Sequence, residues 1–275
     1  MPPTLHDHYA TASDSMAAHL LAALRAEHGA DVAITPDTLA PLDQFHSRGI
    51  TATEELAVLL GPLPGERILD IGCGIGGPAR WIAARYACHV TGVDLTEAFC
   101  RTAAALNEAT GLTGRVEIHN GSATALPLPD AAFDRAYSQN VAMNIADKPQ
   151  MYREAFRVLK PGGVLVLSNL LAGNGPPYFP VPWATIPAHS HLATESETRA
   201  DLLATGFAIE VFDNRSATLR PSLATARRRL EQGAMPPLGL QVLMGPRFAE
   251  MMLNSMKSGE EGRVETVEIR VRKPG

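Results

Sequence analysis

The chain has 275 residues, of which 45% are hydrophobic and 19% are charged, and its formal net charge is −5. This length allows one sizeable core, or one core with a small added lobe. The acidic balance argues against a nucleic-acid partner, because such a partner requires a surplus of Lys and Arg to contact its phosphates.

No apolar run reaches the roughly 18 residues of a membrane span, and the first residues lack the basic start and apolar stretch of an export signal. The three cysteines, Cys73, Cys88 and Cys100, are odd in number and scattered, which does not suggest a disulfide framework. We therefore expect a cytoplasmic protein, either a monomer or a homodimer, with a small-molecule substrate. No residues have the spacing of metal ligands, so we expect no metal.

Residues 1 to about 62 read as a helical cap. Apolar side chains recur at helical spacing over residues 16–24 and again over 51–60. Pro62 and Pro64 then interrupt the chain before the pattern changes. We therefore predict an N-terminal helical cap of residues 1–62 and a second domain of residues 63–275.

Strand and helix patterns alternate along the middle of the chain. The predicted strands are residues 67–71, 89–94, 115–119, 133–138 and 164–169, and the predicted helices are residues 78–86, 97–109 and 148–159. Such alternation is typical of a parallel sheet with helices on both faces.

The last third of the chain is less regular. Residues 171–193 are rich in Gly and Pro and are predicted to form a lid-like insertion, and residues 216–262 a helical insertion. We also predict helices at 194–204, 222–231 and 248–257 and a strand at 207–212. Residues 264–271 alternate apolar and charged side chains, which predicts an edge or hairpin strand with one wet face. The expected fold is α/β and Rossmann-like, with seven mostly parallel strands and one antiparallel strand at the C-terminal edge.

A glycine-rich turn follows the first predicted strand, with the sequence Gly72-Cys73-Gly74-Ile75-Gly76-Gly77. Glycines at such a turn allow positive φ and a close approach of the backbone to a ligand. The turn satisfies G-x-G-x-x-G, which alone fits a nicotinamide or flavin dinucleotide as well as S-adenosylmethionine (SAM).

Two carboxylates favour SAM over a dinucleotide. Asp70 directly precedes the turn, where it would repel a pyrophosphate but would suit a ligand with an ammonium and a sulfonium. Asp94 ends the second predicted strand, where its side chain can accept both ribose hydroxyls.

In residues 69–79 the chain resembles motif I of the class I SAM-dependent methyltransferases, and residues 133–134, 138–140 and 157–163 are similar to later motifs of that class. Residues 43–49, 139–147 and 177–183 resemble the branch of sarcosine and dimethylglycine N-methyltransferases. The resemblance implies SAM as cofactor and methyl transfer to the nitrogen of an amine or amino acid. Two alternatives stay open: O- or C-methylation of a natural product or quinol, and a protein that binds SAM without transferring methyl.

The resemblance also implies a cofactor site. Asp70 and the glycines would surround the methionine part, Asp94 would hold the ribose, and Leu95 would lie against the adenine. Ser122 stands where an aspartate is usual, so the adenine contact would rest on the backbone of Ala123. The implied cofactor-binding residues are Asp70, Gly72, Cys73, Gly74, Gly76, Asp94, Leu95, Ser122, Ala123 and Gln139.

The candidate catalytic residues are His46, Gln139 and Asn140. Related O-methyltransferases often carry a histidine just after the fourth strand, but residues 140–144 contain neither histidine nor carboxylate. His46 is then the best remaining base or substrate ligand, and a purely structural histidine is the alternative. The candidate substrate-binding residues are Tyr9, Gln44, His46, Arg48, Tyr178 and Trp183. The last two are expected to wall an acceptor chamber that closes against the N-terminal cap.

Overall fold

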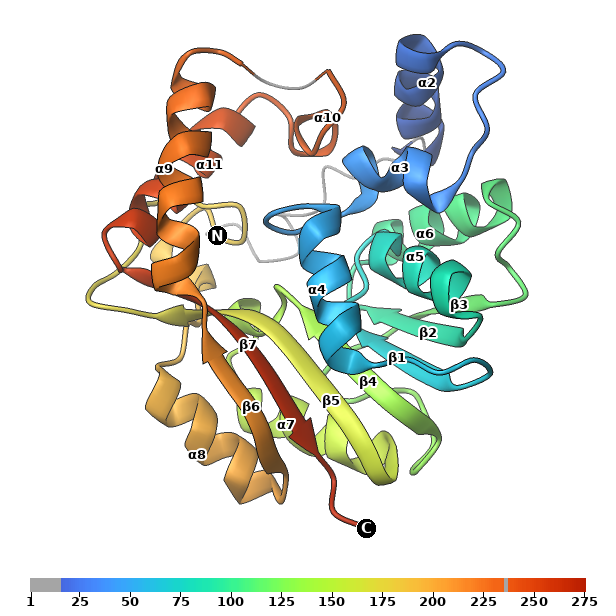
Figure 1. Cartoon of the computed structure of the whole chain (residues 1–275), viewed down its shortest axis with the longest axis vertical. Helices are drawn as coiled ribbons and strands as arrows, with labels where there is room; N and C mark the ends of the chain where they lie inside the picture. Colours follow the sequence, from blue (N-terminus) through green and yellow to red (C-terminus); the bar gives the residue numbers. More distant parts are fainter. Residues whose placement is uncertain (1–15, 235–236) are drawn as a thin grey trace.

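The protein is described by a computed structural model that covers residues 16–234 and 237–275. Seven strands form one sheet in the order β3-β2-β1-β4-β5-β7-β6 (Figure 1). Their bounds are β1 Arg67–Ile71, β2 His89–Asp94, β3 Val116–Asn120, β4 Phe133–Gln139, β5 Leu159–Ala172, β6 Ala208–Asn214 and β7 Val264–Arg272. Strands β1 to β5 pair in parallel, and β7 pairs antiparallel with both of its neighbours.

The predicted sheet, mostly parallel with one antiparallel strand, is confirmed, but β7 lies one place in from the edge. It runs between β5 and the edge strand β6. The expected wet face of β7 is largely covered, since α4 (Ile50–Leu60) packs against it. Glu268 on this face is only 4% exposed and accepts a hydrogen bond from the Ser168 hydroxyl. The predicted edge or hairpin strand at residues 264–271 is antiparallel to its neighbours, but it lies one place inside the edge and its expected wet face is partly buried.

Helices cover both faces of the sheet, as predicted. On one face α4 packs beside α5 (Gly77–Tyr86), and on the other α7 (Lys148–Val158) packs beside α8 (Glu195–Thr205) (Figure 1). A third long helix, α6 (Glu97–Ala109), packs along β2 and β3. Each face thus has its own apolar core, and the carboxyl ends of the strands are left for other segments to cover.

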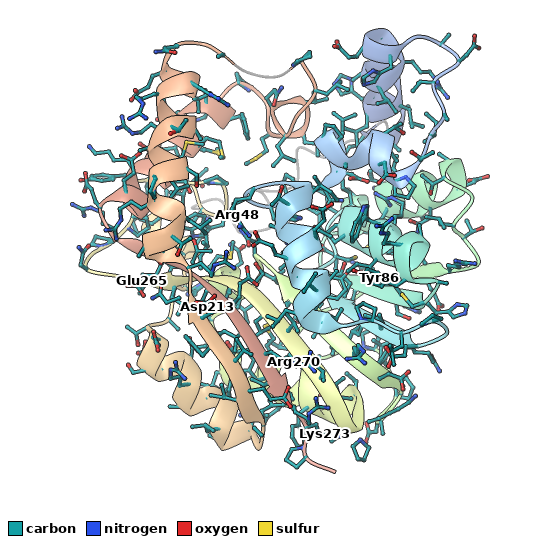
Figure 2. All side chains as sticks on the ribbon, in the orientation of Figure 1. Arg48, Tyr86, Asp213, Glu265, Arg270 and Lys273 are labelled. Carbon is teal, nitrogen blue, oxygen red and sulfur yellow. The ribbon has the colours of Figure 1, made fainter. Side chains whose placement is uncertain are left out.

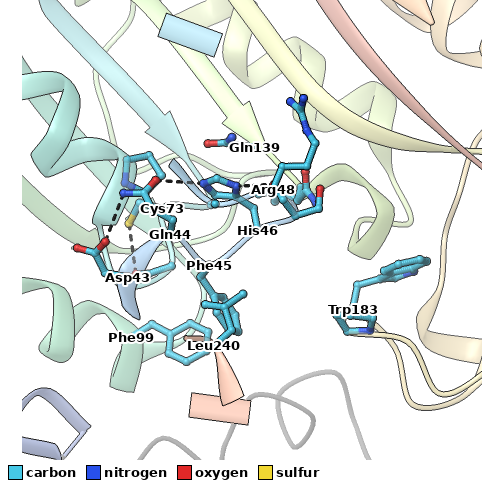
Figure 3. A pocket seen from close by; sticks show the side chains of 18 of the residues that line it. Asp43, Gln44, Phe45, His46, Arg48, Cys73, Phe99, Gln139, Trp183 and Leu240 are labelled. Atoms are coloured by element: carbon cyan, nitrogen blue, oxygen red, sulfur yellow. Dashed lines mark hydrogen bonds between the residues drawn. The ribbon is translucent and has the colours of Figure 1, made fainter. Parts of the chain in front are cut away.

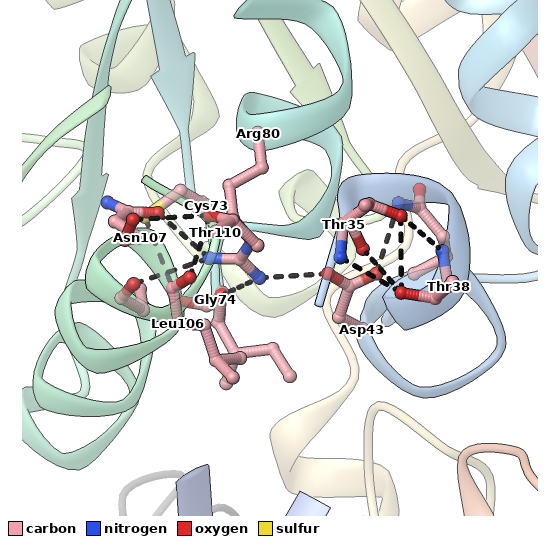
Figure 4. Close-up of polar contacts among 12 residues, drawn as sticks. Thr35, Thr38, Asp43, Cys73, Gly74, Arg80, Leu106, Asn107 and Thr110 are labelled. Carbon is pink, nitrogen blue, oxygen red and sulfur yellow. Dashed lines mark hydrogen bonds and ion pairs between the residues drawn. The ribbon is translucent and has the colours of Figure 1, made fainter. Parts of the chain in front are cut away.

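Two N-terminal helices, α2 (Met16–His28) and α3 (Pro36–Asp43), lie beside α5 and α6. The helix α3 continues through Pro41 to Asp43, although proline is unfavourable inside a helix. The reason is a capping box between Thr35 and Thr38, which starts the helix well before Pro41. The end of α3 is fixed by a buried ion pair, because Asp43 accepts from Arg80 Nη2 at 2.9 Å (Figure 4).

The insertion of residues 216–262 contains α9 (Ser216–Glu231), α10 (Gln241–Met244) and α11 (Phe248–Glu260). The helices α9 and α11 pack on each other. Leu238, just before α10, belongs to the same apolar cluster as Leu20 and Leu24 of α2. The insertion therefore reaches the N-terminal helices above the carboxyl ends of the strands (Figure 1). None of the helices in the described ranges combines the length and apolar character that crossing a membrane requires.

Candidate functional site

A cavity of about 640 Å³ lies at the carboxyl ends of β1, β2 and β4 (Figure 3). Open α/β sheets bind their ligands at this edge, and the volume suits a small-molecule site. Its walls come from several parts of the chain. They are the segment from Asp37 to Ile50, the glycine turn after β1, residues 94–99 after β2, residues 139–144 after β4, Leu170 of β5, and a cover formed by Trp183 with residues of α10 and α11.

Asp94, at the end of β2, shapes the glycine turn. Its Oδ2 accepts from the Gly74 backbone N–H and its Oδ1 from the Thr96 N–H, both at 2.8 Å. Burial raises the pKa of this carboxyl, and the two backbone N–H groups oppose the shift. Each carboxylate oxygen keeps a further lone pair, so Asp94 can still accept hydrogen bonds from ligand hydroxyls in the cavity.

Asp70, at the end of β1, also lines the cavity and is 2% exposed. Its Oδ2 accepts from the Tyr137 hydroxyl at 2.8 Å. The pKa of Asp70 is raised to about 7, mainly by burial. The nearby Asp94 charge contributes to this rise, and the hydrogen bond from Tyr137 opposes it. A positively charged ligand in the cavity would favour the ionised carboxylate.

The glycines of the turn divide into two roles. Gly72 has φ +80°, and a Cβ added there would lie 2.4 Å from Val141 Cγ2. Gly74 has φ +53° and lines the cavity, where an added Cβ would meet only the Phe45 ring at 3.9 Å. Gly76 is instead a packing glycine, because its added Cβ would lie 2.9 Å from Arg80 Nη1. Gly72 and Gly76 thus allow close packing inside the protein, whereas Gly74 leaves its side of the cavity open to a ligand.

Gln139 ends β4 and is 7% exposed. Its Nε2 is buried without a hydrogen-bond partner, while its Oε1 lies 3.4 Å from Thr53 Oγ1. An unpaired buried donor costs about 1–3 kcal/mol, which indicates a place where a ligand supplies the acceptor. The next residue, Asn140, lines the cavity in a left-handed backbone conformation with φ +55°. Such strain in a non-glycine residue occurs most often at ligand sites.

His46 lines the cavity, yet both of its ring nitrogens have partners within the protein. Its Nδ1 lies 3.1 Å from the Ser47 carbonyl oxygen, and its Nε2 lies 3.0 Å from Thr53 Oγ1 and 3.2 Å from Gln44 Oε1. Burial lowers the pKa of His46 to about 4, and the Arg48 charge adds to this effect against the Ser47 hydrogen bond. At neutral pH the ring is therefore uncharged and firmly held, which favours a positioning role over that of a base.

Among the described residues that line the cavity, Arg48 is the only lysine or arginine. Figure 2 shows Arg48 above the upper end of the sheet. Its Nη2 is 2.7 Å from Glu55 Oε2 and 3.9 Å from Glu268 Oε1, and its backbone is left-handed with φ +67°. The guanidinium is thus already neutralised by carboxylates of the protein.

The cavity brings together most of the predicted site residues, but not all of them. It is lined by Gln44, His46, Arg48, Asp70, Gly72, Cys73, Gly74, Asp94, Gln139, Asn140 and Trp183. Gly76, Leu95, Ser122 and Ala123 lie outside its lining, although the last three directly follow β2 and β3 at the same edge of the sheet. Tyr9 lies outside the described residues. Burial raises the pKa of the Cys73 thiol well above its usual value, which argues against a nucleophile.

Tyr178, expected in the chamber wall, does not line the cavity. Its hydroxyl donates to Glu261 Oε2 at 2.8 Å. Its ring lies 4.3 Å from the Lys257 Nζ and 4.3 Å from the Arg263 guanidinium carbon. These partners tie Tyr178 to the end of α11, so that Trp183 contributes to the wall without it.

Several lining residues were missed by sequence reasoning, mainly apolar side chains. They are Phe45, Phe99, Val141, Met143, Leu170, Leu240, Met244, Met252 and Ser255. The helical stretch around Met252 was predicted, but nothing in its sequence indicates that it covers the sheet edge. Within the described residues no group of three or more His, Cys, Asp or Glu could hold a metal ion.

Part of the chain is similar to proteins of known families. Residues 69–167 match the family described as "Methyltransferase domain". A phosphoethanolamine N-methyltransferase from Triticum aestivum is 39% identical over 129 residues, which are 47% of this chain and 25% of that protein. A glycine/sarcosine/dimethylglycine N-methyltransferase from Actinopolyspora halophila is 38% identical over 111 residues, which are 40% of this chain and 20% of that protein.

The chain spans about a quarter or less of the length of these two relatives. Among solved structures, that of the [4+2]-cyclase SpnF is 26% identical, with a TM-score of 0.66 over 82% of this chain and 81% of that one. The matched segment runs from β1 to β5 and so includes Asp70, Asp94 and Gln139. Residues 69–167 are therefore similar to a methyltransferase domain, and the sheet has the Rossmann-like fold of SAM-dependent methyltransferases.

Proposed function

We propose that the protein is an enzyme that transfers a methyl group from SAM to a small molecule. The observation that carries this proposal is the convergence of Asp70, Asp94 and the unpaired Gln139 amide on one cavity. These groups stand at the carboxyl ends of three adjacent strands. Two carboxylates and an amide donor match a ligand that carries an ammonium, ribose hydroxyls and a carboxylate.

The residues present fit SAM part by part. Asp94 would accept the ribose hydroxyls, and the Gln139 Nε2 would donate to the methionine carboxylate. Asp70 would lie near the positive charges of the methionine part. Leu95, Ser122 and the backbone of Ala123 are proposed to complete the adenine site at the ends of β2 and β3. The open backbone at Gly74, which lines the cavity, supports this placement.

When bound, SAM supplies a methyl group on a positively charged sulfur. The acceptor's electron pair forms the new bond to the methyl carbon, while the carbon–sulfur bond breaks and leaves its electrons on sulfur, giving S-adenosylhomocysteine. The protein's contribution is to align the acceptor and to exclude water. We assign His46, Gln44 and Asn140 to this positioning. A His46 ring with a pKa of about 4 is a poor acceptor for the proton of an ammonium ion.

We propose a nitrogen as the acceptor atom, in line with the names of the two N-methyltransferase relatives. The amine would arrive uncharged, and any proton released after transfer would pass to water. We further propose a cytoplasmic protein, since all three cysteines are free and buried. We also propose that the protein is a monomer or a homodimer. It is proposed to consist of a helical cap of residues 1–62 and a SAM-binding domain of residues 63–275, with the insertions 171–193 and 216–262.

The test is a methyl-transfer assay with SAM labelled in its methyl group, incubated with the protein and a pooled metabolite extract. We expect label in a small-molecule product and formation of S-adenosylhomocysteine, both strongly reduced in Asp94→Asn. Binding of S-adenosylhomocysteine without transfer to any pool would support a SAM-binding protein of another activity, a reading that the cyclase neighbour keeps open. Absence of SAM binding would exclude both.

A further inference from the structure

The wall of the cavity opposite the proposed SAM residues is apolar. Its side chains come from the segment after β4, from β5, from the loop before α8, and from the insertion. They are Met143, Leu170, Trp183, Leu240, Met244 and Met252. Met143, Leu170 and Trp183 belong to one buried cluster with Val181 and Val264, so this wall is part of the packed structure. It presents carbon and sulfur, without charge, to a bound molecule.

The indole N–H of Trp183 already has a hydrogen-bond partner within the protein. Its indole Nε1–H donates to Ser190 Oγ at 3.0 Å, and its backbone carbonyl accepts from Asn144 Nδ2 at 2.7 Å. The side chain is thus held at both ends and is 3% exposed. What remains for a ligand is the aromatic surface, which stabilises contact with an apolar or aromatic body.

Among the described lining residues the wall has one cation, and that cation already has a partner. Arg48, the only lysine or arginine among them, donates through Nη2 to Glu55 and lies near Glu268. Arg80, behind the glycine turn, is fully buried and bound to Asp43. A phosphate or carboxylate on the acceptor would lose its hydration and would have to compete with Glu55 for Arg48, which disfavours an anionic acceptor.

Acidic groups are also absent from this wall in the described structure. The carboxylates that line the cavity are Asp37, Asp43, Asp70 and Asp94, which come from α3 and from β1 and β2. A zwitterion seated against Trp183 and Met252 would leave both of its charges unpaired. The nearby polar groups are uncharged, namely the Ser47 and Ser255 hydroxyls and the Asn140 amide. These can hydrogen-bond one hydroxyl, carbonyl or neutral nitrogen.

We propose, on the basis of the proposed function, that the methyl acceptor is an uncharged and predominantly apolar molecule whose body lies against Trp183, Met143 and Met252. Its reacting atom would point toward Gln139 and Asn140. Phosphorylated and zwitterionic amines are then poor acceptors for this chain, even though the names of two relatives refer to such molecules. The apolar wall, and not a charge pair, selects the substrate.

The test uses the protein's own fluorescence, because Trp183 and Trp81 are the two tryptophans of the chain. Trp81 lines a separate groove with Tyr86, so Trp81→Phe leaves Trp183 as the single reporter in the cavity. This protein, saturated with S-adenosylhomocysteine, is titrated with the uncharged apolar probe N-phenyl-1-naphthylamine. We expect saturable quenching of Trp183 and no displacement by a 100-fold excess of phosphoethanolamine or sarcosine.

A second arm locates the probe. In the same background, Met252→Lys places a charge in the apolar wall and is expected to weaken probe binding at least tenfold while S-adenosylhomocysteine affinity stays within twofold. The matched control is Leu203→Lys, which adds the same charge at a side chain that is 58% exposed on α8. The displacement experiment needs no cavity variant, so it decides the question even if Met252→Lys fails to fold.

Displacement by phosphoethanolamine or sarcosine at any concentration up to the 100-fold excess, or no probe binding at all, would overturn the proposed substrate class. Unchanged probe affinity in a folded Met252→Lys protein would overturn its location. Both results are distinct from failure of the proposed function, which would appear as no binding of S-adenosylhomocysteine in the saturation step.

Discussion

Asp94→Asn tests the proposed SAM site most selectively. The substitution keeps the size of the side chain but replaces one carboxylate oxygen by an NH2 group. Both oxygens of Asp94 accept backbone N–H groups, from Gly74 and from Thr96. The asparagine oxygen can keep one of these two hydrogen bonds, but at the other position its NH2 group would face a backbone N–H, and two donors cannot bond. The asparagine also lacks the negative charge that strengthens hydrogen bonds from the ribose hydroxyls.

A hydrogen bond to a charged group contributes about 1.5–3 kcal/mol. Losing one such bond should weaken the binding of S-adenosylhomocysteine by roughly 10- to 150-fold, since each 1.4 kcal/mol is a factor of ten. The assay is isothermal titration of both proteins, with circular dichroism and thermal unfolding as checks of the fold. Asp213→Asn, at an exposed position on the edge strand β6, is the control and should bind like the parent. A folded Asp94→Asn protein with affinity within twofold of the parent would remove Asp94 from the site.

The remaining predictions concern the turn, the pH dependence, the cover and metals. Gly74→Val should reduce SAM affinity at least tenfold, because Gly74 lines the cavity at a left-handed φ of +53° and a β-branched side chain there would occupy the ligand's space; normal binding by calorimetry would show that the turn does not approach the ligand. Because burial raises the pKa of Asp70 to about 7, and a cationic ligand favours its ionised form, SAM affinity should fall about tenfold from pH 8 to pH 6; a flat profile would exclude that contact. Trp183→Ala should lower turnover on the true acceptor at least tenfold, about 1.4 kcal/mol of barrier, with SAM affinity nearly unchanged; parent-like turnover would place the acceptor elsewhere. Dialysis against a chelator should leave activity intact, and recovery only after adding a divalent cation would refute this.

The sheet and the cofactor half of the site could be predicted because their signals are local. Hydrophobic runs alternate with helical spacing between residues 67 and 169, and the acids and glycines follow individual strands within a few residues. Once the strands are parallel, their carboxyl ends share one edge. Asp70, Asp94 and Gln139 therefore meet at one cavity without any further information about distant parts of the chain.

The acceptor half could not be predicted, because its contacts join segments far apart in sequence. Tyr178 and Trp183 are five residues apart in one loop, yet only Trp183 lines the cavity, since Tyr178 is held by residues at the end of α11. Met252 lines the cavity because α11 packs on α9 and on β7, both far from the N-terminal helices in sequence. The burial of Glu268 likewise depends on α4, which lies more than 200 residues earlier.

The central claim is that the cavity at the carboxyl ends of β1, β2 and β4 binds SAM and not a dinucleotide. The most direct measurement is calorimetric titration of the parent protein with S-adenosylhomocysteine and, separately, with NAD. The account predicts saturable binding of one equivalent of S-adenosylhomocysteine per chain and no heat of binding with NAD. Binding of NAD in place of S-adenosylhomocysteine would contradict the assignment of Asp70, Asp94 and Gln139.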